Sequence, residues 1–167
     1  MNQIVNRNNL ESRITFRDLV DSDLPFVKEL LTNEQVMRFI GPGRPLTEHE
    51  IQSWFTDFIN RQRSGHSRRV IGLKDGKQEA FIGICGVLND DGCADFGFYF
   101  LPRYWGKGYA FEACSILLPE AIEQFGDKLV IFVSEQNIAS LSLVKKLGLV
   151  VDKYENYHGR MGYFFKG

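Results

Sequence analysis

One apolar stripe at helical spacing runs through residues 110–125 and constrains the fold more than any other feature of the sequence. Its members recur three or four residues apart: Ala110, Ala113, Cys114, Leu117, Leu118, Ala121, Ile122 and Phe125. This pattern predicts an amphipathic helix, because these positions share one face of an α-helix. That face has to be buried, so the rest of the chain must supply a layer that covers it.

Strand-like runs precede the helix and can form that layer. Residues 67–73 and 78–88 are separated by Lys-Asp-Gly-Lys, a sequence typical of a β-hairpin turn. In a third run, Phe96, Phe98 and Phe100 alternate with residues of the opposite face. Together the three runs predict an antiparallel meander.

The remaining elements follow from the same kind of pattern. Strands are expected at residues 13–17, 129–133, 149–154 and 160–165, and helices at 24–31, 51–59 and 138–147. Asp21, Ser22 and Asp23 are candidate N-caps of the first helix. The order β-α-α-β-β-β-α-β-α-β-β predicts a single α/β domain over residues 1–167, with a mixed, mostly antiparallel sheet and helices on both faces. We expect residues 1–10 to be flexible.

Composition narrows the class of function. The 167 residues carry a formal net charge of −1, whereas nucleic-acid-binding domains usually carry a basic excess, so no nucleic-acid partner is expected. No stretch approaches the roughly 18 apolar residues of a membrane span, and the N-terminus lacks a secretory apolar core, so we expect a cytoplasmic protein with no membrane partner. Both a monomer and a homodimer remain open.

The cysteines give no sign of a metal site or a disulfide. Cys85, Cys93 and Cys114 are odd in number, lie far apart and match no metal-ligand spacing. We therefore expect reduced thiols and no metal, with Cys85 and Cys114 in the core.

A turn with two glycines joins the third strand to the long helix. Residues 101–110 are Leu-Pro-Arg-Tyr-Trp-Gly-Lys-Gly-Tyr-Ala, so Gly106 and Gly108 stand just before the helix. The first N–H groups of a helix lack internal partners, the helix dipole adds about half a positive charge, and glycine lets an anion approach. The turn therefore suits a pyrophosphate, with a turn that binds nothing as the alternative. Neither the Walker pattern nor the G-x-G-x-x-G of dinucleotide sites is present.

This turn resembles the acetyl-CoA-binding motif R/Q-x-x-G-x-G/A of the GNAT acetyltransferase superfamily, matched by Arg103, Gly106 and Gly108. The string at 104–113 looks like the RimJ/RimL-like branch, which acetylates the N-termini of ribosomal proteins. The second family motif follows as Asn-Ile-Ala-Ser at 137–140 and Lys-Leu-Gly-Leu at 146–149. The resemblance extends over nearly the whole chain.

The resemblance implies acetyl-CoA as co-substrate. Backbone N–H groups from Trp105 to Ala110 would bind its pyrophosphate, and the strand around residues 98–101 would pair with the pantetheine arm. Asn137 would hold that arm, or serve as a helix N-cap, or both. The positions assigned to acetyl-CoA are Phe98, Phe100, Leu101, Arg103, Trp105, Gly106, Lys107, Gly108, Tyr109, Ala110 and Asn137.

The catalytic residues are less clearly marked. Many family members carry a Tyr seven residues after this Asn as general acid, but here that position is Val144. Ser140 is the candidate substitute, with a plain first-turn serine as the alternative. Asp95, beside the cofactor strand, is a candidate base, with ordinary surface polarity as the alternative.

The function expected from these features is an acetyl-CoA-dependent N-acetyltransferase. The acceptor would be a primary amine, either a protein N-terminal α-amine or a small-molecule amine, that attacks directly in a ternary complex, with a strand N–H near Phe98 stabilising the oxyanion. At pH 7 roughly one α-amine in ten is neutral, against one lysine amine in several thousand, so weak basic assistance favours an α-amine. The alternatives are a catalytically silent acyl-CoA-binding or regulatory module and a phosphate site for another nucleotide.

Overall fold

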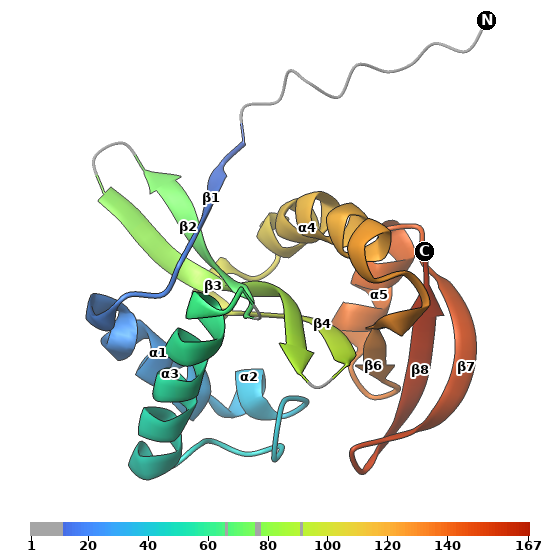
Figure 1. The fold of residues 1–167 in the computed structure, drawn as a ribbon, viewed down its shortest axis with the longest axis horizontal. Coiled ribbons are helices and arrows are strands. Elements are labelled where there is room, and N and C mark those ends of the chain that lie inside the picture. Colours follow the sequence, from blue (N-terminus) through green and yellow to red (C-terminus); the bar gives the residue numbers. More distant parts are fainter. Residues whose placement is uncertain (1–11, 66, 76–77, 91) are drawn as a thin grey trace, which may run out of the picture.

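The computed structural model describes residues 12–65, 67–75, 78–90 and 92–167 (Figure 1). The expected flexibility of residues 1–10 lies outside this range. The helices are α1 (Leu24–Thr32), α2 (Glu34–Met37), α3 (Glu48–Arg63), α4 (Tyr109–Phe125) and α5 (Ile138–Lys146). The strands are β1 (Ile14–Arg17), β2 (Arg69–Asp75), β3 (Gln78–Asp90), β4 (Cys93–Phe100), β5 (Leu129–Val130), β6 (Phe132–Ser134), β7 (Val150–Tyr157) and β8 (Arg160–Lys166). Short 3₁₀ turns lie at Asp21–Asp23, Pro102–Tyr104 and Gly126–Lys128.

Two sheets and two helical layers make up the fold. The larger sheet has the order β1-β2-β3-β4-β5, with antiparallel neighbours except for the parallel pair β4–β5. The smaller antiparallel sheet has the order β6-β8-β7. In Figure 1, α4 covers one face of the larger sheet and α1, α2 and α3 cover the other. The predicted mixed, mostly antiparallel sheet with helices on both faces is confirmed.

The meander follows the predicted alternation. Asp75 pairs with Gln78, so the hairpin turn lies where the sequence places it, although β2 and β3 each run two residues beyond the expected ends. On β4, Phe96 and Phe100 pack into the cluster beneath α4, whereas Tyr99 joins the cluster beneath α1 and α3. The third meander strand is therefore covered on both faces.

The expected single strand at 129–133 is wrong. Leu129–Val130 pairs with Ala94 and Asp95 of β4, and Phe132–Ser134 pairs instead with β8. The chain changes sheets at Ile131, whose carbonyl accepts the Phe165 N–H at 2.9 Å. The run is apolar throughout because both segments lie beside the core, so its pattern did not reveal the break. The larger sheet consequently opens beyond residue 95 of β4.

A short helix, α2, also escaped the sequence analysis. It has four residues, too few for a periodic pattern, and Asn33 caps it by accepting the N–H groups of Gln35 and Val36 at 3.0 and 3.1 Å. Val36 and Met37 are buried and fix the helix against the core. The residues after α2 reach the opening between the sheets.

The expected N-cap role of Asp21, Ser22 and Asp23 is wrong as well. Asp23 stands at the N-cap position of α1, but its carboxylate does not cap that helix. It is 3% exposed, forms a two-bond pair with the Arg17 guanidinium at 2.7 and 2.9 Å, and accepts the Val20 N–H at 3.0 Å. A buried carboxylate requires such partners, so the side chain faces β1 rather than the helix end.

Replacing Asp23 with alanine is expected to lower the free energy of unfolding by roughly 1–3 kcal/mol, because the Val20 N–H would lose its partner and the Arg17 guanidinium would keep only the carboxylate of Glu79. Urea denaturation of the variant beside Asp21→Ala, an exposed carboxylate of the same turn, measures this difference. Equal stability of the two variants would contradict a structural role for the ion pair.

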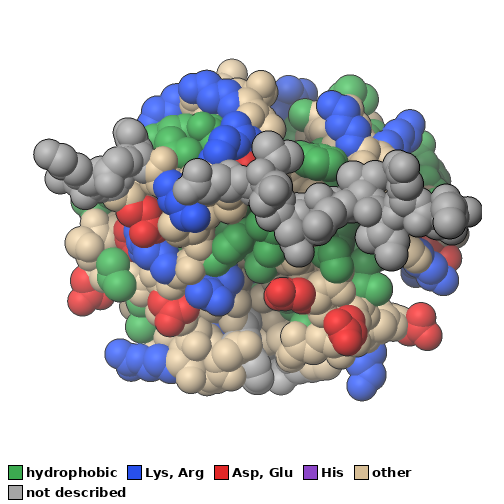
Figure 2. Space-filling view, turned by 90° about the horizontal axis from the view of Figure 1, so that it is seen from above, with side chains coloured by type: hydrophobic (Ala, Val, Ile, Leu, Met, Phe, Trp, Pro, Cys, Tyr) green, Lys and Arg blue, Asp and Glu red, His purple; other side chains and the backbone are tan. Residues whose placement is uncertain are grey.

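The surface seen from the α4 side carries Lys and Arg side chains in several separate groups, with hydrophobic side chains between them (Figure 2). Phe111 and Ile116 of α4 are among the hydrophobic side chains that reach solvent. Across the described residues, every helix is too short or too polar to cross a bilayer. Cys85 and Cys114 are buried and reduced, as expected, and their mutual hydrogen bond together with burial raises the pKa of the Cys114 thiol.

Candidate active site

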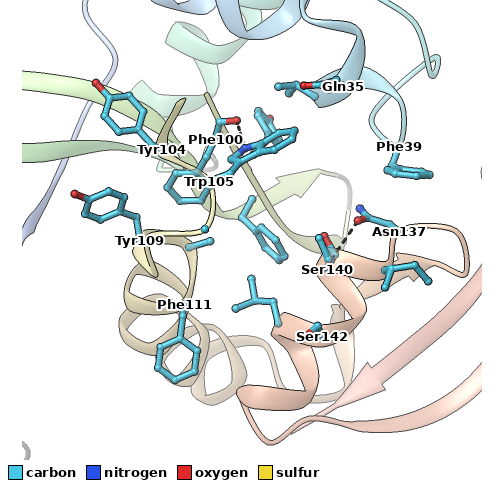
Figure 3. A pocket seen from close by; sticks show the side chains of 18 of the residues that line it. Gln35, Phe39, Phe100, Tyr104, Trp105, Tyr109, Phe111, Asn137, Ser140 and Ser142 are labelled. Atoms are coloured by element: carbon cyan, nitrogen blue, oxygen red, sulfur yellow. Dashed lines mark hydrogen bonds between the residues drawn. The ribbon is translucent and has the colours of Figure 1, made fainter. Parts of the chain in front are cut away.

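A cavity of about 680 Å³ lies where the two sheets part. Its walls come from α2, the end of β4, the start of α4 and α5 (Figure 3). In Figure 3, Trp105 lies between Tyr104 and Tyr109 on one side and Asn137 and Ser140 on the other. Residues singled out from the sequence that line the cavity are Phe98, Phe100, Trp105, Gly106, Gly108, Tyr109, Ala110, Asn137 and Ser140.

The two glycines give the turn a conformation that other residues rarely adopt. Gly106 and Gly108 have φ values of 71° and 84°, in the left-handed region. Gly108 is the N-cap of α4, and the first helical bond runs from the Glu112 N–H to its carbonyl at 3.0 Å. The N–H groups of residues 109–111 therefore have no intrahelical partner, and Gly108 brings no side chain to cap them. These amides at a helix N-terminus form a site suited to an anion.

An unpaired strand edge leads from this turn into the cavity. The Leu101 N–H bonds to the Ile82 carbonyl, which directs the N–H and C=O groups of residues 97 and 99 toward β3. The backbone groups of Phe98 and Phe100 therefore point to the opposite edge, where β5 no longer pairs. Trp105 Nε1 already donates to the Phe100 carbonyl at 2.8 Å, but Phe98 is open to an extended chain that carries amides.

Asn137 and Ser140 face this edge from α5. Asn137 Oδ1 accepts the Ser140 N–H at 3.2 Å, so the cap role considered for Asn137 is real (Figure 3). Among the described residues, neither the Asn137 Nδ2 nor the Ser140 Oγ has a hydrogen-bond partner. Both groups are half-buried and line the cavity, so they are available to a ligand. Val144 is buried in the core and offers no acid.

A second cavity of about 520 Å³ lies beside the first and shares part of its lining. The shared residues are Phe39, Ile40, Phe98, Tyr99, Asn137 and Ser140. Asp95 faces this second cavity, where its carboxylate accepts from Arg68 Nη2 at 3.0 Å and from the Tyr157 hydroxyl at 3.1 Å. Burial and the negative charge of Asp95 raise the pKa of Tyr157, so its phenol keeps its proton. Two ligands could thus meet near Phe98.

Residues 13–150 match the sequence model of the acetyltransferase (GNAT) domain. The chain belongs to the GNAT acetyltransferase family. Its relative YnaD of Bacillus subtilis, named an uncharacterized N-acetyltransferase, is 25% identical over 141 residues, which cover 82% of this chain and 79% of YnaD. The family and this relative identify the protein as an acyltransferase.

Solved GNAT structures share the fold. An acetyltransferase from Agrobacterium tumefaciens superposes with a TM-score of 0.75 at 24% identity, covering 96% and 99% of the two chains. RimL, an acetyltransferase of ribosomal protein L7/L12 solved with coenzyme A, gives 0.70 at 13% identity, covering 93% and 92%. Spermidine N-acetyltransferase from Vibrio cholerae, solved with CoA and spermine, gives 0.68 at 20% identity, covering 93% and 94%.

Three positions assigned to acetyl-CoA by the GNAT motif do not line the larger cavity. Leu101 is fully buried on the α1–α3 side, because strand alternation turns it away from the opening. The Arg103 guanidinium is paired with Glu29 of α1 and lies over the Tyr104 ring. The Lys107 carbonyl accepts a hydrogen bond from a side chain that lies outside the cavity.

The residue that holds Lys107 is Arg13, which the GNAT motifs did not indicate. Its Nη1 donates to the Lys107 carbonyl at 3.0 Å, its Nε pairs with Glu112 at 2.8 Å, and its guanidinium lies 4.4 Å from the Tyr109 ring centre. Arg13 thereby links the glycine turn to the first turn of α4. Ninety-four positions separate it from Lys107, so no local pattern could have found it.

Replacing Arg13 with alanine is expected to weaken acetyl-CoA binding about 10-fold, because the loss of a charge-assisted hydrogen bond frees the turn. The maximal rate at saturating acetyl-CoA should change less, since Arg13 lines neither cavity. Steady-state kinetics of this variant and of Arg69→Ala, an arginine of β2 paired with Asp18, separate the two effects. An unchanged KM for acetyl-CoA would exclude this positioning role.

Proposed function

We propose that this GNAT protein transfers the acetyl group of acetyl-CoA to a primary amine by direct attack within a ternary complex. One observation carries the proposal: the open β4 edge runs from the glycine turn to the place where the two cavities meet, at Phe98, Asn137 and Ser140. A donor held in the larger cavity and an amine in the smaller one would face each other there. Family membership and the CoA-bound relatives support acetyl-CoA as the donor.

The larger cavity fits acetyl-CoA group by group. The free amides of residues 109–111 match a pyrophosphate, since they combine N–H donors with the positive end of a helix. The open carbonyl of Phe98 matches an amide N–H of an extended pantetheine arm, and the Asn137 Nδ2 adds a donor across the gap. When bound, acetyl-CoA supplies an acetyl group activated as a thioester.

The residues near the junction would then perform the transfer. The Phe98 N–H would donate to the acetyl carbonyl oxygen, where negative charge develops. Asp95, held by Arg68 and Tyr157, would accept a hydrogen bond from the incoming amine and assist its deprotonation. Ser140 would donate a proton to the departing thiolate, because its hydroxyl is directed to no other described residue.

The acceptor we propose is a protein N-terminal α-amine or a small-molecule amine. The string at 104–113 favours the RimJ/RimL-like branch, and the likeness to RimL extends to the fold. An α-amine also needs less basic assistance than a lysine, since more of it is neutral at pH 7. A catalytically silent acyl-CoA-binding module remains the second candidate, because Val144 replaces the tyrosine of other family members.

The test is thiol release on a broad amine panel combined with thermal stability. Acetyl-CoA should raise the melting temperature, because a ligand that binds the native state stabilises it. At least one amine should then release CoA faster than buffer does. Stabilisation without release for any amine would support the silent module, and neither effect would contradict the whole proposal.

A further inference from the structure

The smaller cavity has an unbalanced set of charges. Its charged lining consists of Arg68, Asp95 and Arg160, with His158 beside them. The remaining lining is apolar or uncharged, so the electrostatic character of the cavity depends on these side chains. The ion pairs of these side chains determine which charge remains available to a bound molecule.

Arg68 and Asp95 neutralise each other. Arg68 Nη2 lies 3.0 Å from Asp95 Oδ1, its Nη1 donates to the Tyr99 hydroxyl at 3.2 Å, and its Nε donates to the Gly86 carbonyl at 3.2 Å. Each of the three guanidinium nitrogens of Arg68 therefore already donates a hydrogen bond within the protein. Asp95 keeps free lone pairs, since it accepts only one further bond, from Tyr157.

Arg160 has no such partner. Its Nη2 donates to the Gly41 carbonyl at 2.7 Å, and within the described part of the chain no carboxylate pairs with it. It follows a turn in which His158 and Gly159 have φ values of 49° and 83°, which brings the start of β8 opposite the residues after α2. The half-buried guanidinium therefore leaves one net positive charge at the wall of the cavity.

We propose that the acceptor is an amine that also carries a carboxylate, and that Arg160 binds this carboxylate. The amine of the acceptor would face Asp95 and Tyr157, while its carboxylate would face the guanidinium of Arg160. Arginine suits the role because its planar fork matches a carboxylate. A polyamine would place further positive charge beside Arg160 and is disfavoured. The inference rests on the proposed function and specifies its substrate.

The first experiment compares matched acceptors. The probes are the proteinogenic L-amino acids, the α-amides of those that react, spermidine, and short peptides that differ by Glu or Gln at their second residue. We expect kcat/KM for carboxylate-bearing acceptors to exceed that of their amides about 10-fold or more. The amine of an α-amide is less basic, so more of it is neutral and able to attack at pH 7. This difference alone would favour the amides, which is the opposite of the expected result. A preference for free amino acids assigns the bound carboxylate to the α-carboxylate of a small molecule. A preference for Glu over Gln peptides assigns it to a side chain near a peptide N-terminus.

The second experiment removes the charge. In Arg160→Gln the ratio of kcat/KM for acid over amide should fall about 10- to 100-fold, and Arg160→Lys should restore part of it. Lys166→Gln is the control, because it removes the same charge from the other end of β8, outside both cavities, where Lys166 pairs with Asp152. Melting temperature and acetyl-CoA affinity report folding separately.

The outcomes separate this inference from the proposed function. An unchanged acid-to-amide ratio in Arg160→Gln, or a wild-type preference for amides or spermidine, overturns the assignment of Arg160 and leaves the acetyltransferase intact. CoA release with no amine at all overturns the proposed function instead. If Arg160→Gln fails to fold, the acid-to-amide ratio of kcat/KM in Arg160→Lys is used instead, since the lysine keeps the charge but lacks the planar fork. A ratio below that of the native protein supports the assignment, and an unchanged ratio overturns it.

Discussion

Replacing Gly108 with aspartate is expected to raise the dissociation constant of acetyl-CoA by at least about 100-fold. The new carboxylate would stand at the helix N-terminus whose free amides we assign to the pyrophosphate. Two unit charges about 5 Å apart at an effective dielectric constant near 20 repel each other by about 3 kcal/mol. The left-handed φ of 84° adds strain, because any side chain with a Cβ adopts it at a cost.

Gly108→Ala separates charge from strain. Alanine meets the same backbone conformation and the same neighbour, since Arg13 Nη2 lies 3.4 Å from where the new Cβ would stand, but it carries no charge. Its acetyl-CoA affinity should fall less than about 10-fold, since left-handed strain costs roughly 1–2 kcal/mol and is shared with the free protein. Calorimetric titration of both variants measures the difference. Equal affinity of the aspartate variant and the native protein would exclude this turn as the phosphate site.

The turn could be found from the sequence because all its determinants are local. Two glycines between a strand pattern and a strong helical stripe are sufficient to predict free amides at a helix N-terminus. The cap role of Asn137 likewise follows from its position before a helix, whereas its place at the cavity is implied by the resemblance to the second GNAT motif. Such features depend on neighbours within a few residues, which the sequence displays directly.

The parts that escaped prediction depend on contacts between distant segments. The break at Ile131 is set by the Phe165 N–H on β8, and the apolar run around it is equally compatible with one strand. Arg13 acts through Lys107 and Glu112, about a hundred positions away in the chain. Tyr157 likewise reaches Asp95 only through the folded smaller sheet.

The smaller cavity shows the same limit. Asp95 could be singled out because it lies beside the cofactor strand, but its chemistry depends on Arg68 and Tyr157, which flank it only in the fold. Arg160 and the residues after α2 likewise line that cavity together from opposite ends of the chain. Sequence reasoning therefore indicated many residues that line the larger cavity and fewer of those that line the smaller one.

Replacing Ser140 with alanine is expected to lower kcat about 10- to 100-fold, because general-acid assistance contributes roughly that much or more and Val144 offers no alternative. The KM for acetyl-CoA should stay within about 3-fold, since the Ser140 N–H that Asn137 caps is retained and alanine is a good helix former. Ser142→Ala is the matched control, because Ser142 lies on the same helix but lines only the larger cavity.

The acidity of the leaving thiol distinguishes a proton donor from a structural serine. If Ser140 protonates the leaving thiolate, the deficit of the alanine variant should shrink with an acetyl thioester of a more acidic thiol, which leaves readily as the anion. A serine that only packs at the helix start would give the same deficit with both thioesters. Turnover of Ser140→Ala equal to that of Ser142→Ala would remove Ser140 from the mechanism.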